Sequence, residues 1–244
     1  MSLPLLSIII PAHNEEQRLP RSLEQVFAFL QKQAYEAEVL VVENGSSDRT
    51  GELAEDFARH HPNLRVLREP GRGKGLAVRR GMLEARGRYR FMCDADLSMP
   101  IAEVNKFIPP ALDGFDVAIG SREAPGAVRY DEPLTRHLGG RLINTIIRLL
   151  ILPRLHDTQC GFKCFRAEIA ESLFRRQQMD GWSFDIEVLY LAQCEGARLV
   201  EVPVHWYYRS ESKVHALRDA LRMVRDIFTI RANMRRGLYH EDRS

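Results

Sequence analysis

Residues 5–16 read LLSIIIPAHNEE, and this stretch decides the fold because it joins a buried strand directly to a polar cluster. Residues 6–10 form an apolar run that contains one serine, Ser7, and such a run is typical of a strand covered on both faces of a parallel sheet. Pro11 ends the run, and His13-Asn14-Glu15 follow it. The same succession returns at residues 39–48 (VLVVENGSSD) and 89–96 (YRFMCDAD), so it organises the first half of the chain.

Amphipathic stretches alternate with these strands. Residues 21–33 carry apolar side chains at helical spacing, which predicts a helix, and Ser46 or Ser47 is the expected N-cap of a second helix at 48–60. The alternation predicts an α/β, Rossmann-like fold, in which helices flank both faces of a mostly parallel sheet. The remaining elements expected in this half are strands at 39–42, 64–67, 89–93 and 116–120 and a helix at 76–85.

After residue 120 the order of elements is less regular. A length of 244 residues suits one α/β domain better than two. We therefore expect one domain at 1–213 and, at 214–244, an amphipathic helical extension of the same domain. The elements expected here are a loop to 133, a helix through 152, strands near 161–165 and 199–204, and helices at 167–174, 183–195 and 214–238.

Composition excludes several classes of protein. With 45% hydrophobic and 28% charged residues the chain is not disordered, and a net charge of +2 gives no reason to expect nucleic-acid binding. No Cys-x-x-Cys pair is present, which favours reduced structural thiols in the cytoplasm over zinc or disulfides. The first residues lack the basic region of a signal peptide, and no apolar run reaches the roughly 18 residues of a membrane span.

The polar clusters follow strands whose carboxyl ends share one edge of the sheet, where open α/β folds bind ligands. Asp94-Ala95-Asp96 follows the strand at 89–93, and residues two apart at a strand end point to the same side. Two such carboxylates repel each other, and a divalent ion such as Mg²⁺ or Mn²⁺ would offset this repulsion. Substrate phosphates and water would complete the coordination shell of the ion. The alternative is a solvated loop with two acidic residues.

Two further turns could bind a ligand. Glu43-Asn44-Gly45 begins a strand-to-helix turn that could either face a ligand or only cap a helix. In Arg72-Gly73-Lys74-Gly75 the glycines allow close approach of a ligand to the backbone and Lys74 supplies charge, which suits phosphate. Near the end of the chain, Arg209 and Lys213 could neutralise a diphosphate, or could belong to a solvated basic loop.

Taken together, these motifs resemble family 2 glycosyltransferases of the GT-A fold. The first half contributes residues 7–16 (SIIIPAHNEE), 42–48 (VENGSSD), 73–75 (GKG), 94–96 (DAD) and 120–122 (GSR). Residues 157–163 (DTQCGFK), 181–187 (GWSFDIE) and 201–204 (EVPV), with 209–213, look like the polyprenyl-phosphate sugar transferases, and most like the dolichyl-phosphate beta-glucosyltransferases. The resemblance spans residues 5–213.

The resemblance implies inverting transfer of a hexose, glucose from UDP-glucose, to a polyprenyl or dolichyl phosphate. It also implies a role for each matching residue. The nucleotide would be bound by Pro11, His13, Glu15, Glu43, Lys74 and Asp94, and the Mg²⁺ or Mn²⁺ by Asp94 and Asp96. The diphosphate or the acceptor phosphate would be bound by Arg122, Arg209, Ser212 and Lys213. The catalytic carboxylate would be Asp157, with Asp185 as second choice.

Two positions depart from the family pattern. The family usually has paired aspartates where this chain has Glu43-Asn44, and Ser98 stands where mannosyl members tend to have glutamine. The departure at Ser98 favours glucose over mannose. GDP-mannose as donor, a sugar hydroxyl as acceptor and a nucleotide-sugar binding module without catalysis remain the alternatives. A nucleotidyltransferase is disfavoured, because no glycine-rich phosphate loop follows the first strand.

The acceptor determines what the catalytic carboxylate must do. A phosphate monoester has a second pKa of about 6, so it is mostly dianionic at neutral pH and scarcely needs a base. We therefore expect Asp157 to orient a lipid phosphate or the metal, and to act as a base only toward a hydroxyl.

The last predicted helix bears on where the protein acts. Basic amphipathic helices can lie in an anionic membrane interface, although the helix could equally pack on the domain with its arginines solvated. Residues 139–152 are a second candidate contact, or else core or a dimer surface. We predict a cytoplasmic protein that binds the membrane peripherally and can oligomerise. Apolar side chains on one side of the last helix are Leu217, Leu221, Val224, Phe228 and Met234.

Overall fold

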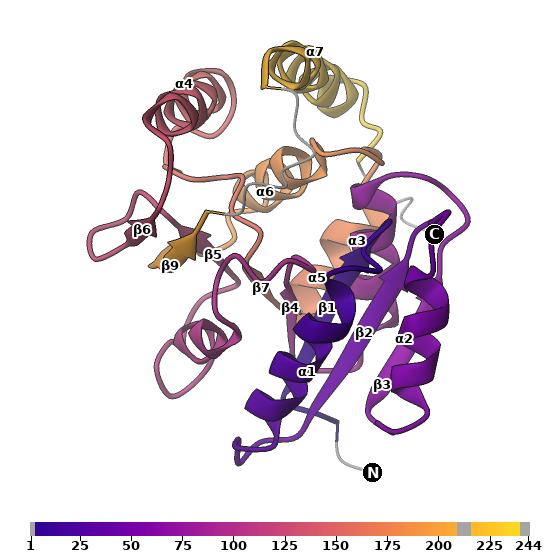
Figure 1. The fold of residues 1–244 in the computed structure, drawn as a ribbon. Helices are drawn as coiled ribbons and strands as arrows, with labels where there is room; N and C mark the ends of the chain where they lie inside the picture. The colour runs from indigo at the N-terminus through magenta and orange to yellow at the C-terminus, as the bar shows by residue number, and fades with distance from the viewer. Residues whose placement is uncertain (1–2, 209–215, 240–244) are drawn as a thin grey trace.

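The computed structural model describes residues 3–208 and 216–239. Its centre is a seven-stranded sheet with the strand order β3-β2-β1-β4-β7-β5-β8 (Figure 1). This confirms the predicted α/β architecture. The strands are β1 (Leu6–Ala12), β2 (Ala37–Glu43), β3 (Leu64–Arg68), β4 (Tyr89–Met92), β5 (Val117–Ser121), β7 (Lys163–Arg166) and β8 (Leu199–Pro203).

The sheet is mostly parallel, as predicted. β1 pairs in parallel with β2 and β4, and β5 pairs in parallel with β8. β7 runs antiparallel to both of its neighbours, β4 and β5. The parallel strands β1, β2 and β4 therefore end on one edge, and the polar clusters that follow them meet there.

Side chains of β1 alternate between two apolar cores, because successive residues of a strand point to opposite faces. Leu6, Ile8 and Ile10 pack with helices α1 (Leu19–Leu30) and α2 (Thr50–Ala58) and the 3-10 helix η1 (Ile101–Phe107). Ile9 packs on the other face. That face is covered by α3 (Lys74–Glu84), α5 (Ala167–Arg176) and α6 (Phe184–Cys194).

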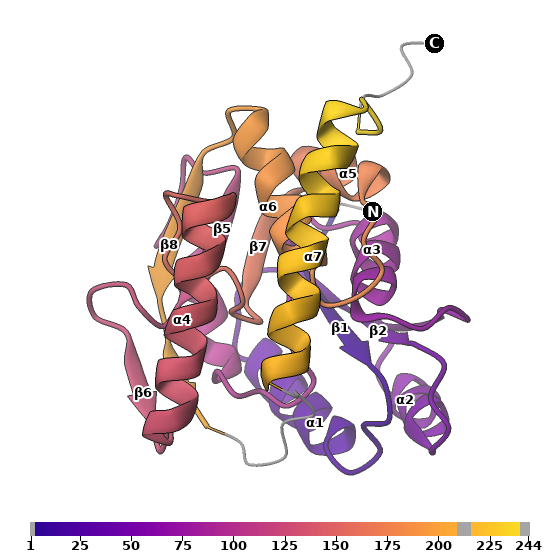
Figure 2. The same cartoon turned by 90° about the horizontal axis from the view of Figure 1, so that it is seen from above.

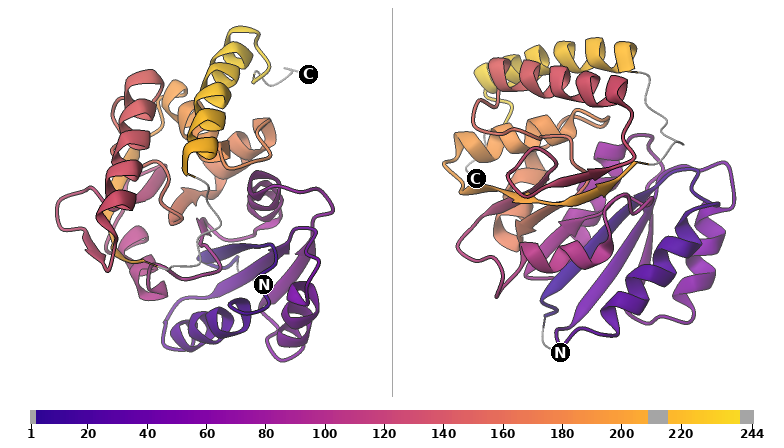
Figure 3. Two further views of the ribbon diagram at one scale, coloured as in Figure 1. Left: turned by 45° about the horizontal axis from the view of Figure 1, so that its top comes forward. Right: turned by 60° about the vertical axis from the view of Figure 1, so that its left-hand side comes forward.

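Two long helices form an outer layer on the second face. α4 (Leu134–Leu150) and α7 (Ala216–Arg235) lie side by side in the view from above (Figure 2) and together cover α6 (Figure 3). Arg231 of α7 donates a hydrogen bond from Nη1 to the carbonyl oxygen of Leu150 at 3.1 Å. Helices predicted from separate parts of the sequence thus form one layer. In the described part of the chain, no helix is long and apolar enough to cross a membrane.

Two expectations about local structure are wrong. Neither Ser46 nor Ser47 caps α2; Asp48 accepts a hydrogen bond from Thr50 N at 3.0 Å instead. Part of the expected loop before residue 133 is strand β6 (Val128–Tyr130), which pairs with β9 (His205–Tyr207) as a separate two-stranded sheet. These strands are three residues long and far apart in sequence, so local patterning carries no signal for them. The strand expected near 161–165 is present as β7, which begins two residues later, at Lys163.

The four cysteines are free. Cys93, Cys160 and Cys164 are buried and Cys194 is exposed. Burial raises the pKa of the Cys160 thiol to about 11, which keeps it protonated and unreactive at neutral pH.

Candidate functional site

A cavity of about 380 Å³ opens at the carboxyl ends of β1, β2 and β4, the edge at which the polar clusters meet. It collects eight of the predicted site residues from five separate segments of the chain. These residues are Pro11, His13, Glu15, Lys74, Asp94, Asp96, Arg122 and, from α6, Asp185.

The two aspartates that follow β4 line this cavity in different electrostatic states. Asp94 Oδ1 lies 2.6 Å from Lys74 Nζ. Burial works to raise the pKa of Asp94, but the Lys74 charge and hydrogen bond outweigh it and the pKa is lowered. The pKa of Asp96 is raised, first by burial and then by the charge of Asp94, although its Oδ1 accepts a hydrogen bond from Ser98 N at 2.9 Å. Additional positive charge beside Asp96 would therefore be stabilising.

The carboxylates fit a divalent ion that takes part of its coordination from a ligand. Among residues 3–208 and 216–239, no group of three or more acidic, histidine or cysteine side chains is gathered closely enough to hold a metal ion alone. Mg²⁺ and Mn²⁺ sites commonly use one or two carboxylates and complete their shell with phosphate oxygens and water. Asp94 and Asp96 supply the two carboxylates, so the donor set suits an ion that bridges to a diphosphate.

Gly161 controls the position of Asp94. A Cβ atom placed on Gly161 would lie 2.0 Å from Asp94 Oδ2, far inside van der Waals contact. The backbone of the segment before β7 therefore packs directly on the carboxylate, and any side chain there would displace it.

The glycines around Lys74 have a packing role that the sequence did not suggest. We expected them to let backbone approach a ligand, and Gly73 lines the cavity. In addition, Cβ atoms on Gly73 and Gly75 would lie 2.1 and 2.4 Å from the carbonyl oxygens of Asp180 and Met179, so both glycines approach the protein's own main chain closely. This close approach brings Trp182 next to Lys74, whose Nζ lies 5.0 Å from the centroid of the indole ring.

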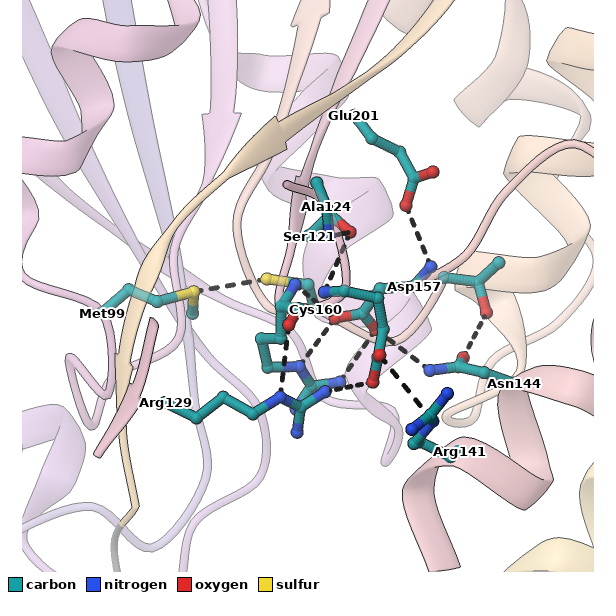
Figure 4. A network of polar contacts seen from close by, with 12 residues as sticks. Met99, Ser121, Ala124, Arg129, Arg141, Asn144, Asp157, Cys160 and Glu201 are labelled. Carbon is teal, nitrogen blue, oxygen red and sulfur yellow. Dashed lines mark hydrogen bonds and ion pairs between the residues drawn. The ribbon is translucent and has the colours of Figure 1, made fainter. Parts of the chain in front are cut away.

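Asp157 is fully buried, with Asn144 and Glu201 beside it (Figure 4), and it holds Arg122 by a bidentate ion pair. Arg122 Nε and Nη2 donate to the two carboxylate oxygens at 2.7 and 2.9 Å, and Arg122 N donates to Oδ2 at 3.0 Å. Asn144 of α4 adds a longer bond of 3.4 Å, and Glu201 of β8 accepts from Asp157 N at 3.0 Å. Burial opposes ionisation of Asp157, but the Arg122 charge and hydrogen bonds lower its pKa to about 2.

This geometry places the two predicted catalytic carboxylates differently. Asp157 is not among the residues that line the cavity, whereas the Arg122 guanidinium that it holds does line it and lies 5.5 Å from the Trp206 ring centroid. Asp185 reaches the cavity itself, with its Oδ1 2.9 Å from Lys163 Nζ. Burial outweighs the Lys163 charge and raises the pKa of Asp185.

Of the two residues at the end of β2, the cavity uses Asn44 rather than the predicted Glu43. Glu43 is buried, and its Oε1 accepts a hydrogen bond from Ser46 N at 2.5 Å within the turn. Asn44 lines the cavity and accepts from Gly73 N at 3.0 Å through Oδ1. Its carbonyl oxygen lies 2.7 Å from His13 Nδ1. Asn44 therefore ties the first-strand cluster to the loop that carries Lys74.

Several cavity residues were not assigned a role from the sequence. Arg18 lies just before α1, and Glu15 accepts from its Nε and Nη2 at 2.6 and 2.7 Å. Three of these residues, Arg72, Gln159 and Trp182, lie inside sequence motifs described above, so the motifs could have identified them. No motif of the sequence contains Arg18 or Trp206. Three residues predicted to bind phosphate, Arg209, Ser212 and Lys213, lie outside the described residues.

Comparisons with known proteins identify the family of this chain. Residues 7–174 match the family described as Glycosyl transferase family 2. The dolichyl-phosphate beta-glucosyltransferase of Drosophila melanogaster is 36% identical over 243 residues, covering 92% of this chain and 74% of that protein. The human dolichyl-phosphate beta-glucosyltransferase is 31% identical over 251 residues, covering 96% and 77%.

Solved structures agree on the fold. The crystal structure of glucosyl-3-phosphoglycerate synthase from Mycobacterium tuberculosis, in complex with Mn²⁺, UDP-glucose and phosphoglyceric acid, has a TM-score of 0.66 to this chain. The match covers 96% of this chain and 80% of that one at 17% identity, so it shows a common GT-A-like fold. Because the family match spans more than half of the chain and the relatives align with nearly all of it, this chain belongs to glycosyl transferase family 2 and is related to the dolichyl-phosphate glucosyltransferases.

Proposed function

We propose that this protein transfers glucose, with inversion, from UDP-glucose to a polyprenyl phosphate in the presence of Mg²⁺ or Mn²⁺, and that it does so as a peripheral protein on the cytoplasmic face of a membrane. The observation that carries the proposal is the pairing, in one cavity, of Asp94 and Asp96 with Lys74 and Arg122. Such a set of charges suits a metal-bound diphosphate. The names of the relatives support glucose and a lipid phosphate.

Asp94 and Asp96 would hold the divalent ion together with oxygens of the donor diphosphate. When bound, the ion neutralises negative charge that develops on the departing diphosphate. Lys74 and Arg122 add fixed positive charge to the same cavity. Burial by itself would lower the pKa of both side chains. The negative charge of Asp94 raises the pKa of Lys74, and the negative charge of Asp157 raises the pKa of Arg122, so both side chains stay protonated.

The nucleophile in this reaction needs little help to ionise. An oxygen of the acceptor phosphate, mostly dianionic at neutral pH, forms the new bond at the anomeric carbon while the bond to the diphosphate breaks on the opposite face and UDP leaves. The role that then remains for Asp157 is to hold Arg122 in the cavity, where the guanidinium can face either phosphate. Asp157 is in this account a positioning residue, as its burial and bidentate pairing support.

One observation favours a second candidate, in which the acceptor is a hydroxyl. Asp185 lines the cavity and has a raised pKa, the two properties that a general base requires. A hydroxyl acceptor would have to lose its proton during transfer, and Asp185 would take it, because Asp96, which shares both properties, is assigned to the metal.

The experiment that tests the proposal measures label extracted into organic solvent after incubation with Mn²⁺ or Mg²⁺ and a short-chain polyprenyl phosphate. Labelled UDP-glucose and GDP-mannose are compared as donors, and the matching polyprenol replaces the phosphate in a parallel assay. We expect extractable label from UDP-glucose and the phosphate only. Extractable label from GDP-mannose would contradict UDP-glucose as the donor. Label on the polyprenol would favour the mechanism in which Asp185 acts as a base toward a hydroxyl acceptor.

We expect Gly161→Ala to lower the rate of this transfer by at least about a hundredfold, because its Cβ would displace Asp94 from the metal site and a small misplacement of catalytic groups is costly. Gly139→Ala is the matched control, since a Cβ at Gly139 in α4 meets nothing within 4 Å. The readouts are the initial transfer rate and the Mn²⁺ concentration for half-maximal activity. Equal rates for the two variants would contradict the assigned position of Asp94.

A further inference from the structure

The outer layer formed by α4 and α7 exposes large apolar side chains to solvent. Leu138 and Leu142 lie one turn apart on α4, and Leu149, further along the helix, is 80% exposed. On α7, Leu221 is 67% exposed and Phe228 lies two turns further on. Since the two helices lie side by side, these residues are parts of one surface, which we call the α4/α7 face (Figure 2).

The opposite side of each helix is anchored to the domain. Ile147 of α4 and Ile227 and Ile230 of α7 are fully buried in the core beneath. Ser183, just before α6, donates to Asp226 Oδ2 at 2.6 Å. Beyond the end of α7, Tyr239 donates to the buried Glu187 at 2.5 Å. With the inner side fixed, neither helix can turn its exposed leucines inward without losing these contacts.

The α4/α7 face is basic as well as apolar. Arg141 of α4 and Arg222 and Arg225 of α7 are exposed. Among the side chains described in these two helices, the acidic one is Asp226, which is bound to Ser183. Leucines and phenylalanine flanked by arginines, with no exposed acid among the described positions of α4 and α7 themselves, match the requirements of an interface that contains anionic lipid.

We propose that the α4/α7 face rests on an anionic lipid bilayer. The proposal deepens the proposed function, on which it rests, by identifying the surface that meets the membrane of the lipid acceptor. A second copy of the chain is the poorer occupant, because a two-fold interface pairs the same patch with itself and would bring arginines close to arginines. Lipid headgroups supply the complementary negative charge.

The position of the cavity agrees with this orientation. Trp182, a cavity residue, is 53% exposed, and a Cβ on the neighbouring Gly181 would lie 3.9 Å from Arg222 Nη2 of α7. The rim of the cavity is therefore next to the basic edge of the α4/α7 face. A phosphate held at headgroup depth by Arg222 would stand beside the cavity while its prenyl chain stayed in the bilayer.

Flotation of the full chain with vesicles tests this surface without reference to catalysis. Vesicles of phosphatidylcholine alone are compared with vesicles that also contain phosphatidylglycerol. We expect binding to the anionic vesicles that weakens as salt is raised. Leu142→Ser/Phe228→Ser and Arg222→Gln/Arg225→Gln should each weaken it by at least about tenfold, whereas the exposed controls Leu3→Ser and Arg21→Gln should not.

Each result has a defined meaning. Unchanged vesicle binding in both double variants would overturn the α4/α7 face as the docking surface. So would a dimer in solution that Leu142→Ser/Phe228→Ser dissociates, because the face would then belong to a second copy. Failure of the proposed function is distinguishable, since it would appear as loss of transfer to a detergent-dispersed acceptor in a protein that still floats with anionic vesicles.

Discussion

Asp96→Asn is expected to lower kcat/KM for sugar transfer by at least about 10³-fold while leaving the protein folded. A metal held by Asp94 and Asp96, as proposed, would supply several kcal/mol of stabilisation to the departing diphosphate, and each 1.4 kcal/mol is worth about tenfold in rate. Asparagine keeps the size of the side chain and its capacity to accept from Ser98 N, but removes the charge. The loss should therefore appear in activity and metal dependence rather than in Tm.

Asp113→Asn provides the control for this experiment, because Asp113 is exposed and does not line the cavity. Initial rates are measured over a range of Mn²⁺ and Mg²⁺ concentrations for both variants and the unsubstituted protein. If Asp96→Asn retained more than about a tenth of the activity at saturating metal, Asp96 would not be a metal ligand.

Asp157→Ala is expected to have the largest effect on stability. It would leave the Arg122 guanidinium, whose side chain is 17% exposed, without the partner that receives its bidentate bonds. Breaking a buried pair by removing one partner costs about 3–5 kcal/mol, which corresponds to a fall in Tm of roughly 10 °C for a chain of this size. Thermal unfolding followed by circular dichroism measures the change.

A surface pair separates this effect from the general loss of an ion pair. Glu52 pairs with Arg49 at 3.0 Å, and both side chains are more than half exposed. Glu52→Ala should leave Tm unchanged within experimental error, because exposed pairs contribute little. A fall in Tm of the same size in both variants would contradict the special role of the buried pair.

The same pair makes a prediction about pH. Because folding lowers the pKa of Asp157 from an ordinary value of 3.8 to about 2, its contribution to stability is complete above about pH 4 and is lost as the pH falls through about 2. The contribution is about 2 kcal/mol. Urea unfolding between about pH 5 and 2 should show it in the unsubstituted protein and not in Asp157→Asn.

Asp157→Asn also tests the catalytic role of this position. If Asp157 positions Arg122, the variant should lose transfer to a phosphate acceptor by at least about a hundredfold, and raising the pH should not restore the rate. Recovery at high pH would contradict positioning, because it would mean that the acceptor needs deprotonation. Asp185→Asn, measured in parallel, should impair transfer to a hydroxyl acceptor more than transfer to a phosphate.

The parts of the site that could be predicted are those that depend on strand ends. Asp94 and Asp96 follow β4, and His13 and Glu15 follow β1, so their meeting at one edge follows from parallel pairing alone. Glu43 and Asn44 could not be told apart in this way. They are consecutive at the end of β2, where neighbouring side chains point in opposite directions, and only the packed turn shows which of them faces the cavity.

Contacts between residues that are far apart in the sequence could not be predicted from local sequence patterns. Arg122 and Asp157 are 35 residues apart, and each is separately a plausible site residue; their ion pair decides that Arg122 faces the cavity and Asp157 does not. Arg231 and Leu150 are 81 residues apart, and their contact joins α7 to α4. Such pairings depend on how whole elements pack, which hydrophobic periodicity does not encode.

The sequence by itself determined that this chain is an α/β protein with polar residues gathered at the carboxyl edge of its sheet, because a buried strand and the polar residues after it are local patterns. It also determined the family, through motifs that carry the aspartates and glycines of the cavity. Only the tertiary structure decided that Asp185 rather than Asp157 reaches the cavity and that α4 and α7 share one exposed face. The direction of a buried side chain and the surface left uncovered are set by contacts between distant segments, and these exist only after folding.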